Sequence, residues 1–360
     1  MKICYFADAP SIHVVRWCKH FAALGHEVHL ISFKQNEIED VTTHFIDTGS
    51  IAVGGGNWKV LLKFWQIKKI LKQIKPDIFH AMYATSYGIT GALCGFHPYI
   101  ITTLGTDVLI SPKESFIYRM LLKFAFSKAD WITAMADHMK IAIEELGVPS
   151  QKISTVPFGI DPLIFNDKNR KLPADKFVIT STRNFEPVYN IPHLIKAVAI
   201  AKKSIPNLQL NLIGAGSLQN EIINLIKELG LESNVLFLGK VSQPKIAEVL
   251  NQTHVFVTVS KSDGNNISLN EAMACGAACI ATNIPANTQW IKDGENGFIV
   301  NIDDIELLAE KIIYLNSNFD KFQNRAIAIN QKIIAERAIW NTNMNIVEQK
   351  YISLIKNNEQ

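Results

Sequence analysis

The chain has 360 residues, of which 48% are hydrophobic and 19% are charged. This length predicts two domains, and the apolar content excludes a disordered chain. The formal net charge of +3 is too small to indicate a nucleic-acid partner. Asp8 comes too early for a signal peptide, and no apolar run reaches the ~18 residues of a membrane span, so we expect a cytoplasmic protein.

Short apolar strands alternate with amphipathic helices from the first residue onward. The strand predicted at 2–7 and the helix predicted at 12–24 begin this pattern. Such alternation is typical of an α/β fold with a parallel sheet covered by helices. A polar, proline-marked stretch at 161–175 predicts a linker to a second domain of the same kind. Further strands are predicted at 27–33, 78–81, 177–181, 208–213, 235–238, 254–259 and 278–281.

Residues 57–75 combine lysines with large apolar side chains and contain no acid. The spacing puts the basic and the apolar residues on largely separate helix faces. One interpretation is a helix that lies on a membrane surface, and the other is a domain helix with a lysine-rich solvent face. The glycines at 54–56 predict a flexible loop before this helix.

The segment after the strand at 254–259 carries the most informative motif. Asp263 lies in a polar loop, and Glu271 lies in a helix predicted to start near Ile267 and to stop at Gly276. The free amides and the dipole at a helix start favour a bound diphosphate. A carboxylate one turn into the helix can accept hydrogen bonds from the paired hydroxyls of a ribose.

Two carboxylates separated by seven residues make this segment similar to the acidic motif of glycosyltransferase family 4. The resemblance implies a GT-B fold, in which two Rossmann-like domains face each other across a cleft. In this family the second acid, here Glu271, binds the nucleotide ribose, and the first acid, here Asp263, lies against the transferred sugar. The first acid is usually glutamate, so Asp263 implies a different sugar pose. A capped surface helix with two unrelated acids is the alternative.

Arg183 follows the strand at 177–181, where the family places an arginine and a lysine on the donor diphosphate. The resemblance implies that Arg183 neutralises charge on the departing diphosphate. Tyr189 stands at the lysine position, in a segment one residue longer. Diphosphate binding is then expected to depend on Arg183, on helix-start amides and on Lys261. A surface role for Arg183 is the alternative.

Other donor-side residues follow from the same resemblance. Gly214 and Gly216 lie in a turn after the strand at 208–213, where glycines allow a close backbone approach to a ligand. Val241 ends a stretch that resembles the segment whose backbone contacts the base. The remaining residues that we expect at the donor are Gly264, Asn265, Asn266 and Ser268.

The first domain binds the acceptor in this family. Ser11 and His13 follow the first strand, in place of the usual glycine-rich loop, and a helix that starts beside them offers amides to phosphate. His80 lies at the end of another strand, the side of a sheet where ligands usually bind. The alternatives are a helix-start residue for His13 and a core histidine for His80.

Asp107 is the acid nearest to the place of a histidine that many relatives carry. Leu104 occupies that place here, so the role of the histidine is not carried over. Asp107 is the nearest group able to orient or deprotonate an acceptor hydroxyl, and we predict this catalytic role for it. The alternative is that it only caps a turn.

The resemblance implies that residues 1–165, with the helix at 340–360, form the acceptor domain and that residues 173–339 bind a nucleotide-sugar donor. We expect a retaining transfer of a hexose-type sugar, from a UDP-sugar first and a GDP-sugar second. The expected acceptor is a glycan or lipid-linked oligosaccharide of surface polysaccharide (O-antigen or capsule) synthesis, at the inner face of the cytoplasmic membrane. No Asp-x-Asp motif is present and Cys275 and Cys279 lack a second ligand pair, so we expect neither a metal nor another cofactor.

Two alternative functions share this fold. One is an isomerase that epimerises UDP-N-acetylhexosamines, for which a histidine partnered with the matching carboxylates is missing from the sequence. The other is a catalytically silent nucleotide-sugar binding protein, which the missing family lysine and histidine favour. Acceptor dependence and turnover separate these from a transferase.

Overall fold

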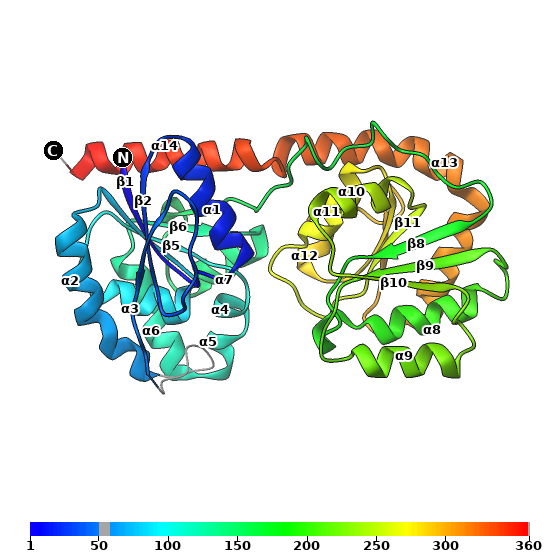
Figure 1. The fold of residues 1–360 in the computed structure, drawn as a ribbon, viewed down its shortest axis with the longest axis horizontal. Coiled ribbons are helices and arrows are strands. Elements are labelled where there is room, and N and C mark those ends of the chain that lie inside the picture. Colours follow the sequence, from blue (N-terminus) through cyan, green and yellow to red (C-terminus); the bar gives the residue numbers. More distant parts are fainter. Residues whose placement is uncertain (50–57, 359–360) are drawn as a thin grey trace. The chain divides into compact units, whose positions relative to one another are not determined.

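The computed structural model describes residues 1–49 and 58–358, which form two compact units (Figure 1). The first unit comprises Met1–Val156 and Met344–Gln360, and the second comprises Pro157–Asn343. The glycine loop predicted at 54–56 lies outside the described residues. Among the described helices none is long and apolar enough to cross a membrane.

The first unit is built on a parallel sheet of seven strands in the order β3-β2-β1-β4-β5-β6-β7. Its strands are mostly continuous apolar runs that are buried on both faces, as expected of a parallel sheet. The order reverses between β1 and β4, which makes the carboxyl ends of these two strands a topological switch point. The strands are β1 (Lys2–Phe6), β2 (Glu27–Ser32), β3 (Thr42–Phe45), β4 (Ile78–Met82), β5 (Tyr99–Thr102), β6 (Trp131–Ala134) and β7 (Ile153–Thr155).

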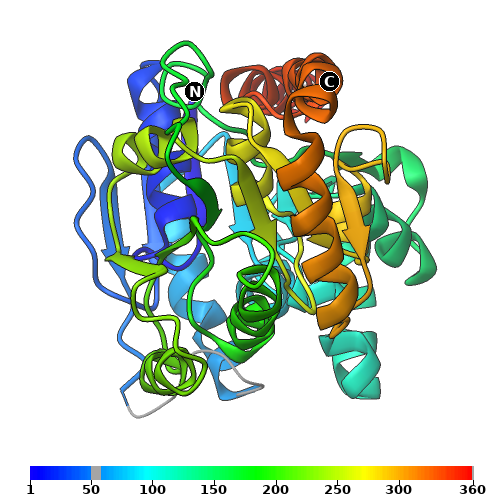
Figure 2. The same ribbon diagram turned by 90° about the vertical axis from the view of Figure 1, so that its right-hand side faces the viewer.

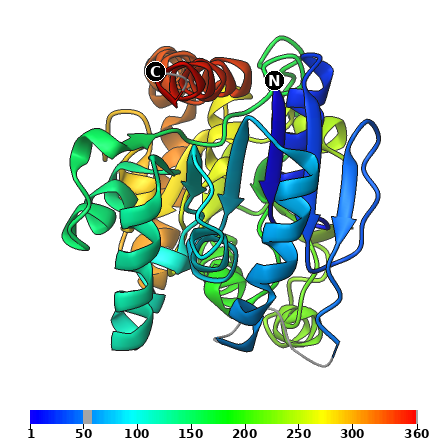
Figure 3. The same cartoon turned by 90° about the vertical axis from the view of Figure 1, so that its left-hand side faces the viewer.

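Helices cover both faces of this sheet (Figures 1 and 3). On one face α3 contacts both α2 and α6, and on the other α1 and α14 pack together. The described part of the lysine-rich stretch, from residue 58 onward, is a short 3₁₀ helix, η1, followed by α2. The helices are α1 (Ile12–Ala23), η1 (Trp58–Lys63), α2 (Phe64–Ile74), η2 (Ala84–Gly88), α3 (Ile89–Ala92), α4 (Thr106–Leu109), α5 (Ser111–Glu114), α6 (Phe116–Lys128), α7 (Asp137–Glu145), η3 (Ser150–Lys152) and α14 (Trp340–Asn358).

His80 lies in the core of the first unit and not in an acceptor site. It is fully buried on β4, where one ring nitrogen contacts the hydroxyl of Tyr351 and the other lies 2.6 Å from Thr102 Oγ1. The rings of Trp17 and Tyr351 pack edge-on against it. The acceptor-side prediction for His80 is therefore wrong, because its polar atoms are used to attach α14 to the sheet.

The second unit has a parallel sheet of six strands in the order β10-β9-β8-β11-β12-β13 (Figure 2). Its switch point lies between β8 and β11. The strands are β8 (Phe177–Ser181), β9 (Leu208–Ile213), β10 (Val235–Gly239), β11 (Val255–Thr258), β12 (Ala278–Thr282) and β13 (Phe298–Val300). The helices are η4 (Pro187–Tyr189), α8 (Ile191–Ala201), α9 (Gln219–Glu228), α10 (Gln243–Asn251), α11 (Ile267–Ala274), α12 (Pro285–Thr288) and α13 (Ile305–Arg337).

Two apolar layers form the core of the second unit. One layer packs α8, α9 and the first part of α13 on the sheet, and the other packs α10, α11 and the end of α13. The helix α13 bends at Asn318, whose backbone is not helical, and its part after the bend contributes Phe322 to the first layer and Ile334 to the second. Ile160 and Phe165 belong to the second layer, so the first unit ends at Val156 rather than at 165.

Burial lowers the pKa of His80 to about 3, which predicts an acid-sensitive first unit. The folded chain keeps His80 neutral, whereas the unfolded chain binds a proton below its ordinary pKa of about 6.5. The contribution to stability is complete above pH 6.5 and is lost as the pH falls toward 3. The free energy of unfolding of the parent should fall between pH 7.5 and pH 5. In His80→Gln this fall should be smaller by about 2 kcal/mol. Urea midpoints at both pH values measure this, and equal pH dependence in the two proteins would contradict it.

Candidate active site

Two loops meet at the carboxyl edge of the second sheet. One follows β8 and carries Arg183, and the other follows β11 and carries Asp263. Because β8 and β11 are neighbours at the switch point, these loops lie side by side, and the amide of Lys261 donates a 2.8 Å hydrogen bond to the Val188 carbonyl. The structure thus brings together the two residues that the sequence predicted for charge stabilisation and sugar contact.

Arg183 is held on several sides. Its Nη2 donates to Asp263 Oδ2 at 2.6 Å, and its Nη1 donates to Asn266 Oδ1 at 3.2 Å. Its guanidinium carbon lies 4.1 Å from the centre of the Tyr189 ring, a cation–π contact at the position where the family has a lysine. The side chain is 10% exposed, and its buried Nε has no hydrogen-bond partner among the described residues. The alternative of a surface arginine is therefore excluded.

Asp263 is nearly buried beside this guanidinium. Burial raises the pKa of its carboxyl, while the charge of Arg183 and hydrogen bonds from the amides of Gly264 and Asn265 oppose that shift. These amides precede α11 and were predicted to face a diphosphate. In this structure these amides donate to Asp263. The Asp263 carboxylate therefore accepts the hydrogen bonds that a bound anion would otherwise accept from this loop.

Two asparagines that were predicted to contact the donor are bound to the protein instead. Asn266 begins α11 as its N-cap, with Oδ1 accepting from the Leu269 amide and Nδ2 donating to Thr258 and Asn287. Asn265 Oδ1 accepts from the indole nitrogen of Trp290 at 3.0 Å. Asn266 is buried and positions Arg183, whereas Asn265 is half-buried, and a donor contact of either residue stays a prediction.

Glu271 lies within α11 and is 8% exposed, and Ser268 lies half-buried in the first turn of the same helix. Next to Glu271, Asn270 is fully buried, and neither its amide oxygen nor its nitrogen has a hydrogen-bond partner in the part of the chain that the structure describes. Sequence analysis missed Asn270, and only its polarity inside a buried helix could have indicated it.

Gly214 and Gly216 approach the protein's own chain. A Cβ on Gly214 would lie 2.7 Å from the Arg183 carbonyl oxygen, and one on Gly216 would lie 2.5 Å from that of Phe185. Gly214 also has φ +145°, which disfavours other residues. The predicted close approach exists, but its partner is the loop after β8 rather than a ligand. These glycines therefore leave room for the loop after β8, which carries Arg183, to pack closely against their backbone.

Lys261 and Val241 lie away from the Arg183 contacts. Lys261 Nζ lies 3.3 Å from Asp303 Oδ1, and this aspartate also accepts from Asn190 Nδ2 and pairs with His193. Val241 is half-buried in the coil between β10 and α10. The position of Lys261 does not support the predicted diphosphate contact, because its ammonium is paired with Asp303.

In the first unit Asp107 is a structural acid. It is fully buried, and its carboxylate accepts hydrogen bonds from the amides of Ala84, Leu104 and Gly105 at 2.7–3.2 Å. Burial raises the pKa of the carboxyl, and these amides oppose that shift. The predicted catalytic role is wrong, because the oxygens needed for an acceptor hydroxyl already hold two loops together.

Ser11 lines a cavity of about 220 Å³ at the carboxyl edge of the first sheet. Asp8, which the sequence analysis did not single out, also lines this cavity. His13 lies half-buried at the start of α1, and burial, followed by the charge of Arg16, lowers the pKa of its imidazole. Ser11 and Asp8 thus line one cavity of the first unit, and the acceptor-side role of Ser11 stays a prediction.

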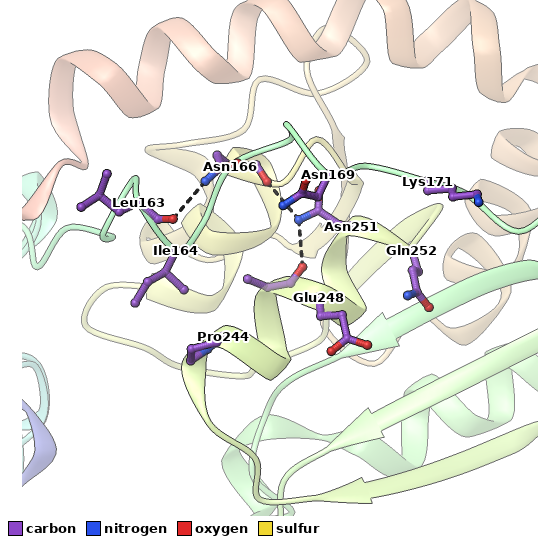
Figure 4. A pocket seen from close by; sticks show the side chains of 10 residues that line it. Leu163, Ile164, Asn166, Asn169, Lys171, Pro244, Glu248, Asn251 and Gln252 are labelled. Carbon is purple, nitrogen blue, oxygen red and sulfur yellow. Dashed lines mark hydrogen bonds between the residues drawn. The ribbon is translucent and has the colours of Figure 1, made fainter.

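A larger cavity of about 530 Å³ lies elsewhere in the second unit (Figure 4). It is formed where the segment around 163–171 crosses α10, and Asn251 ties the two together by donating to the carbonyls of Asn166 and Ala247. It lies at neither switch point, and none of the predicted site residues lines it. Among the described residues no group of three or more His, Cys, Asp or Glu is placed to hold a metal ion.

Two family models match the chain. The model described as glycosyl transferases group 1 matches residues 164–332, and the model described as glycosyl transferase 4-like matches residues 2–136. N-acetyl-alpha-D-glucosaminyl L-malate synthase from Bacillus anthracis is 26% identical, over 85% of this chain and 84% of its own length. UDP-Gal:alpha-D-GlcNAc-diphosphoundecaprenol alpha-1,3-galactosyltransferase from Escherichia coli is 28% identical, over 68% of this chain and 67% of its own length.

Solved structures share the fold of the whole chain. HepE from Anabaena, solved with UDP, has a TM-score of 0.81 at 17% identity and covers 98% of this chain and 100% of its own. Sucrose-phosphate synthase from Thermosynechococcus elongatus has a TM-score of 0.83 at 19% identity, covering 99% and 100%. With two parallel-sheet α/β units and family matches in both, the chain belongs to the GT4-type family of GT-B glycosyltransferases.

Proposed function

We propose that this glycosyltransferase moves a hexose-type sugar, with retention of configuration, from a nucleotide-diphosphate donor to a glycan or lipid-linked acceptor. The observation that carries the proposal is the nearly buried guanidinium of Arg183 at the switch point of the second sheet, paired with Asp263. A fixed cation in a desolvated site stabilises charge on a departing diphosphate without reorganisation. The donor then binds on the second unit, with Glu271 on its ribose.

A retaining transfer on this site uses the leaving group as the base. As the bond from the anomeric carbon to the diphosphate oxygen breaks, that oxygen takes the proton of the acceptor hydroxyl, which attacks on the same face. Arg183 neutralises the charge that collects on the diphosphate. Asp263 accepts a hydrogen bond from a hydroxyl of the transferred sugar. We expect no metal in this step, because the positive charge comes from the guanidinium of Arg183.

The relatives support the choice of ligands. The Escherichia coli relative is named for UDP-Gal and for a diphosphoundecaprenol acceptor, and HepE was solved with UDP. We therefore take UDP-sugar as the donor, with GDP-sugar second, and place the reaction in surface polysaccharide synthesis. An isomerase would convert the nucleotide sugar without an acceptor, and a silent binding protein would not turn it over.

We also propose that the first unit contacts the inner face of the cytoplasmic membrane. In η1 and α2 the side chains of Leu62 and Trp65 are 62% and 68% exposed, among lysines. The first turn of α6 exposes Phe116 and Ile117 by 76% and 70%, close in sequence to Arg119. Both helices begin at the same end of the unit (Figures 1 and 3). Apolar side chains among basic ones fit an anionic lipid surface.

Arg183→Lys should lower turnover about a hundredfold or more, because a lysine keeps the charge but cannot bond both Asp263 and Asn266 while meeting the diphosphate. The measurement is kcat in an acceptor-dependent assay with UDP-sugar, with and without a chelator. Arg325→Ala, which removes an exposed arginine from the same unit, is the control and should leave turnover unchanged. Full activity of the Arg183 variant would remove this residue from the mechanism.

Glu271→Gln should weaken UDP binding about tenfold, since an amide is a weaker acceptor for ribose hydroxyls than a carboxylate. Calorimetric titration of UDP measures the loss, and titration of GDP tests the choice of base. Glu228→Gln, an exposed acid on α9, serves as the matched control. Unchanged UDP affinity in the Glu271 variant contradicts the ribose assignment.

Replacing Lys63, Lys68, Lys69 and Lys72 together with Gln should reduce binding to vesicles that contain anionic lipid, because each lysine near the surface contributes about 1 kcal/mol. Co-sedimentation at low and high salt measures the effect, which should shrink as salt screens the charges. A second quadruple variant removes the same charge from exposed lysines of the second unit and should bind as the parent does. It carries Gln at Lys203, Lys227, Lys240 and Lys321. A parent protein that does not co-sediment with the vesicles would contradict the membrane proposal.

A further inference from the structure

The cavity of about 220 Å³ in the first unit lies at the switch point of its sheet. Asp8 follows β1 and Tyr83 follows β4, the two strands between which the strand order reverses. Ligands of open α/β sheets bind in the crevice at this place. The residues that line it include Asp8, Ser11, Lys34, Tyr83, Ser86 and Leu104.

Asp8 has an unused hydrogen-bonding oxygen. Its Oδ2 lies 3.1 Å from Lys34 Nζ, whereas its Oδ1 is buried and has no partner among the described residues. An ionised oxygen that is removed from water without a donor costs free energy, which a hydroxyl or water donor in the cavity would recover. The polar edge of the cavity therefore presents the acceptor Asp8 Oδ1 and the donor Lys34 Nζ.

Tyr83 forms a strained wall of the same cavity. Its φ of 85° and ψ of 105° lie outside the regions that residues with a side chain normally adopt. The strain is held by hydrogen bonds on both sides, from its amide to the Thr102 carbonyl and from the Gly88 amide to its own carbonyl. Its hydroxyl lies 2.8 Å from Thr106 Oγ1. Residues held in this way cluster at ligand sites.

Asp107 fixes this wall without facing the cavity. Its carboxylate binds the amide of Ala84, next to Tyr83, and the amide of Leu104. It thereby joins the loop after β4 to the loop after β5, and each loop contributes a lining side chain. The wall thus consists of one aromatic and one aliphatic side chain at fixed positions.

We propose that this cavity binds one neutral, polyhydroxylated ring, the sugar of the acceptor, with Asp8 accepting from its hydroxyls and Tyr83 packing against its apolar face. The proposal rests on the proposed function, in which the first unit takes the acceptor. Pockets that hold drug-sized ligands measure about 300–1,000 Å³, so this smaller cavity suits a single ring. The amides at the start of α1 favour an anion, but the Asp8 carboxylate beside them disfavours one.

The test measures binding to the full chain by saturation-transfer NMR, with N-acetylglucosamine as the neutral probe and L-malate and inorganic phosphate as anionic probes. We expect the sugar to bind and the anions not to bind. Asp8→Asn should weaken the sugar at least tenfold, because it removes the charged acceptor, and Lys34→Gln should weaken it as well. Glu37→Gln, an exposed acid of the same unit, should leave binding unchanged.

Melting temperatures and UDP affinities of all variants distinguish an effect on this cavity from unfolding and from an effect on donor binding. A folded Asp8→Asn protein with parental UDP affinity and lost sugar binding supports the proposal. Equal sugar binding in the parent and the Asp8 variant overturns it, as does binding of malate or phosphate that strengthens when Asp8 becomes neutral. A parent protein that does not bind UDP would instead contradict the proposed function.

Discussion

A guanidinium can be removed from water only where carboxylates and carbonyl oxygens meet its donors, and this constraint organises the second unit. Arg183 is satisfied by Asp263 and by Asn266, which lie on the loop after β11 and at the start of α11. The loops after β8 and β11 are therefore fixed against each other. Gly214 is needed because any side chain there would collide with the Arg183 carbonyl. The contacts that stabilise this edge also fix a cation at the switch point, where the proposed function places the diphosphate of the donor.

The first unit also buries a charged group, a carboxylate, which likewise needs hydrogen-bond partners inside the protein. Asp107 accepts three backbone amides and is fully buried, which leaves it no contact with substrate. Arg183 keeps a tenth of its side chain exposed, and its Nε has no hydrogen-bond partner within the part of the chain that the structure describes. Arg183 follows β8 at the switch point of its sheet, whereas Asp107 follows β5, one strand away from the switch point of the other sheet, and both of its carboxylate oxygens are occupied. This difference in remaining hydrogen-bonding capacity, rather than position at a strand end, separates a site residue from a structural one.

The sequence was sufficient for features that depend on local pattern. The bounds of β8 and β9 agree with the predicted strands, because β8 begins with an apolar run and β9 alternates leucine with polar residues. The short and half-exposed β3 gave no such signal. Features set by distant contacts were not predictable. Arg170 lies in the stretch predicted as a linker, yet its guanidinium binds the carbonyls of Leu250, Thr253 and Cys275, which draws that stretch into the second unit. The burial of His80 likewise depends on Tyr351, far along the chain.

The ion pair between Arg183 and Asp263 also bears on which part of a donor this site can accept. A diphosphate that binds Arg183 competes with a carboxylate 2.6 Å away, and displacing it leaves a nearly buried acid without its cation. Burial already raises the pKa of Asp263, so the acid then needs a hydrogen-bond donor. A sugar hydroxyl supplies that donor while the diphosphate takes the guanidinium. Under the proposed function an intact nucleotide sugar would therefore satisfy both groups at once, whereas a bare nucleotide would satisfy only one, so the pair would select for the complete donor.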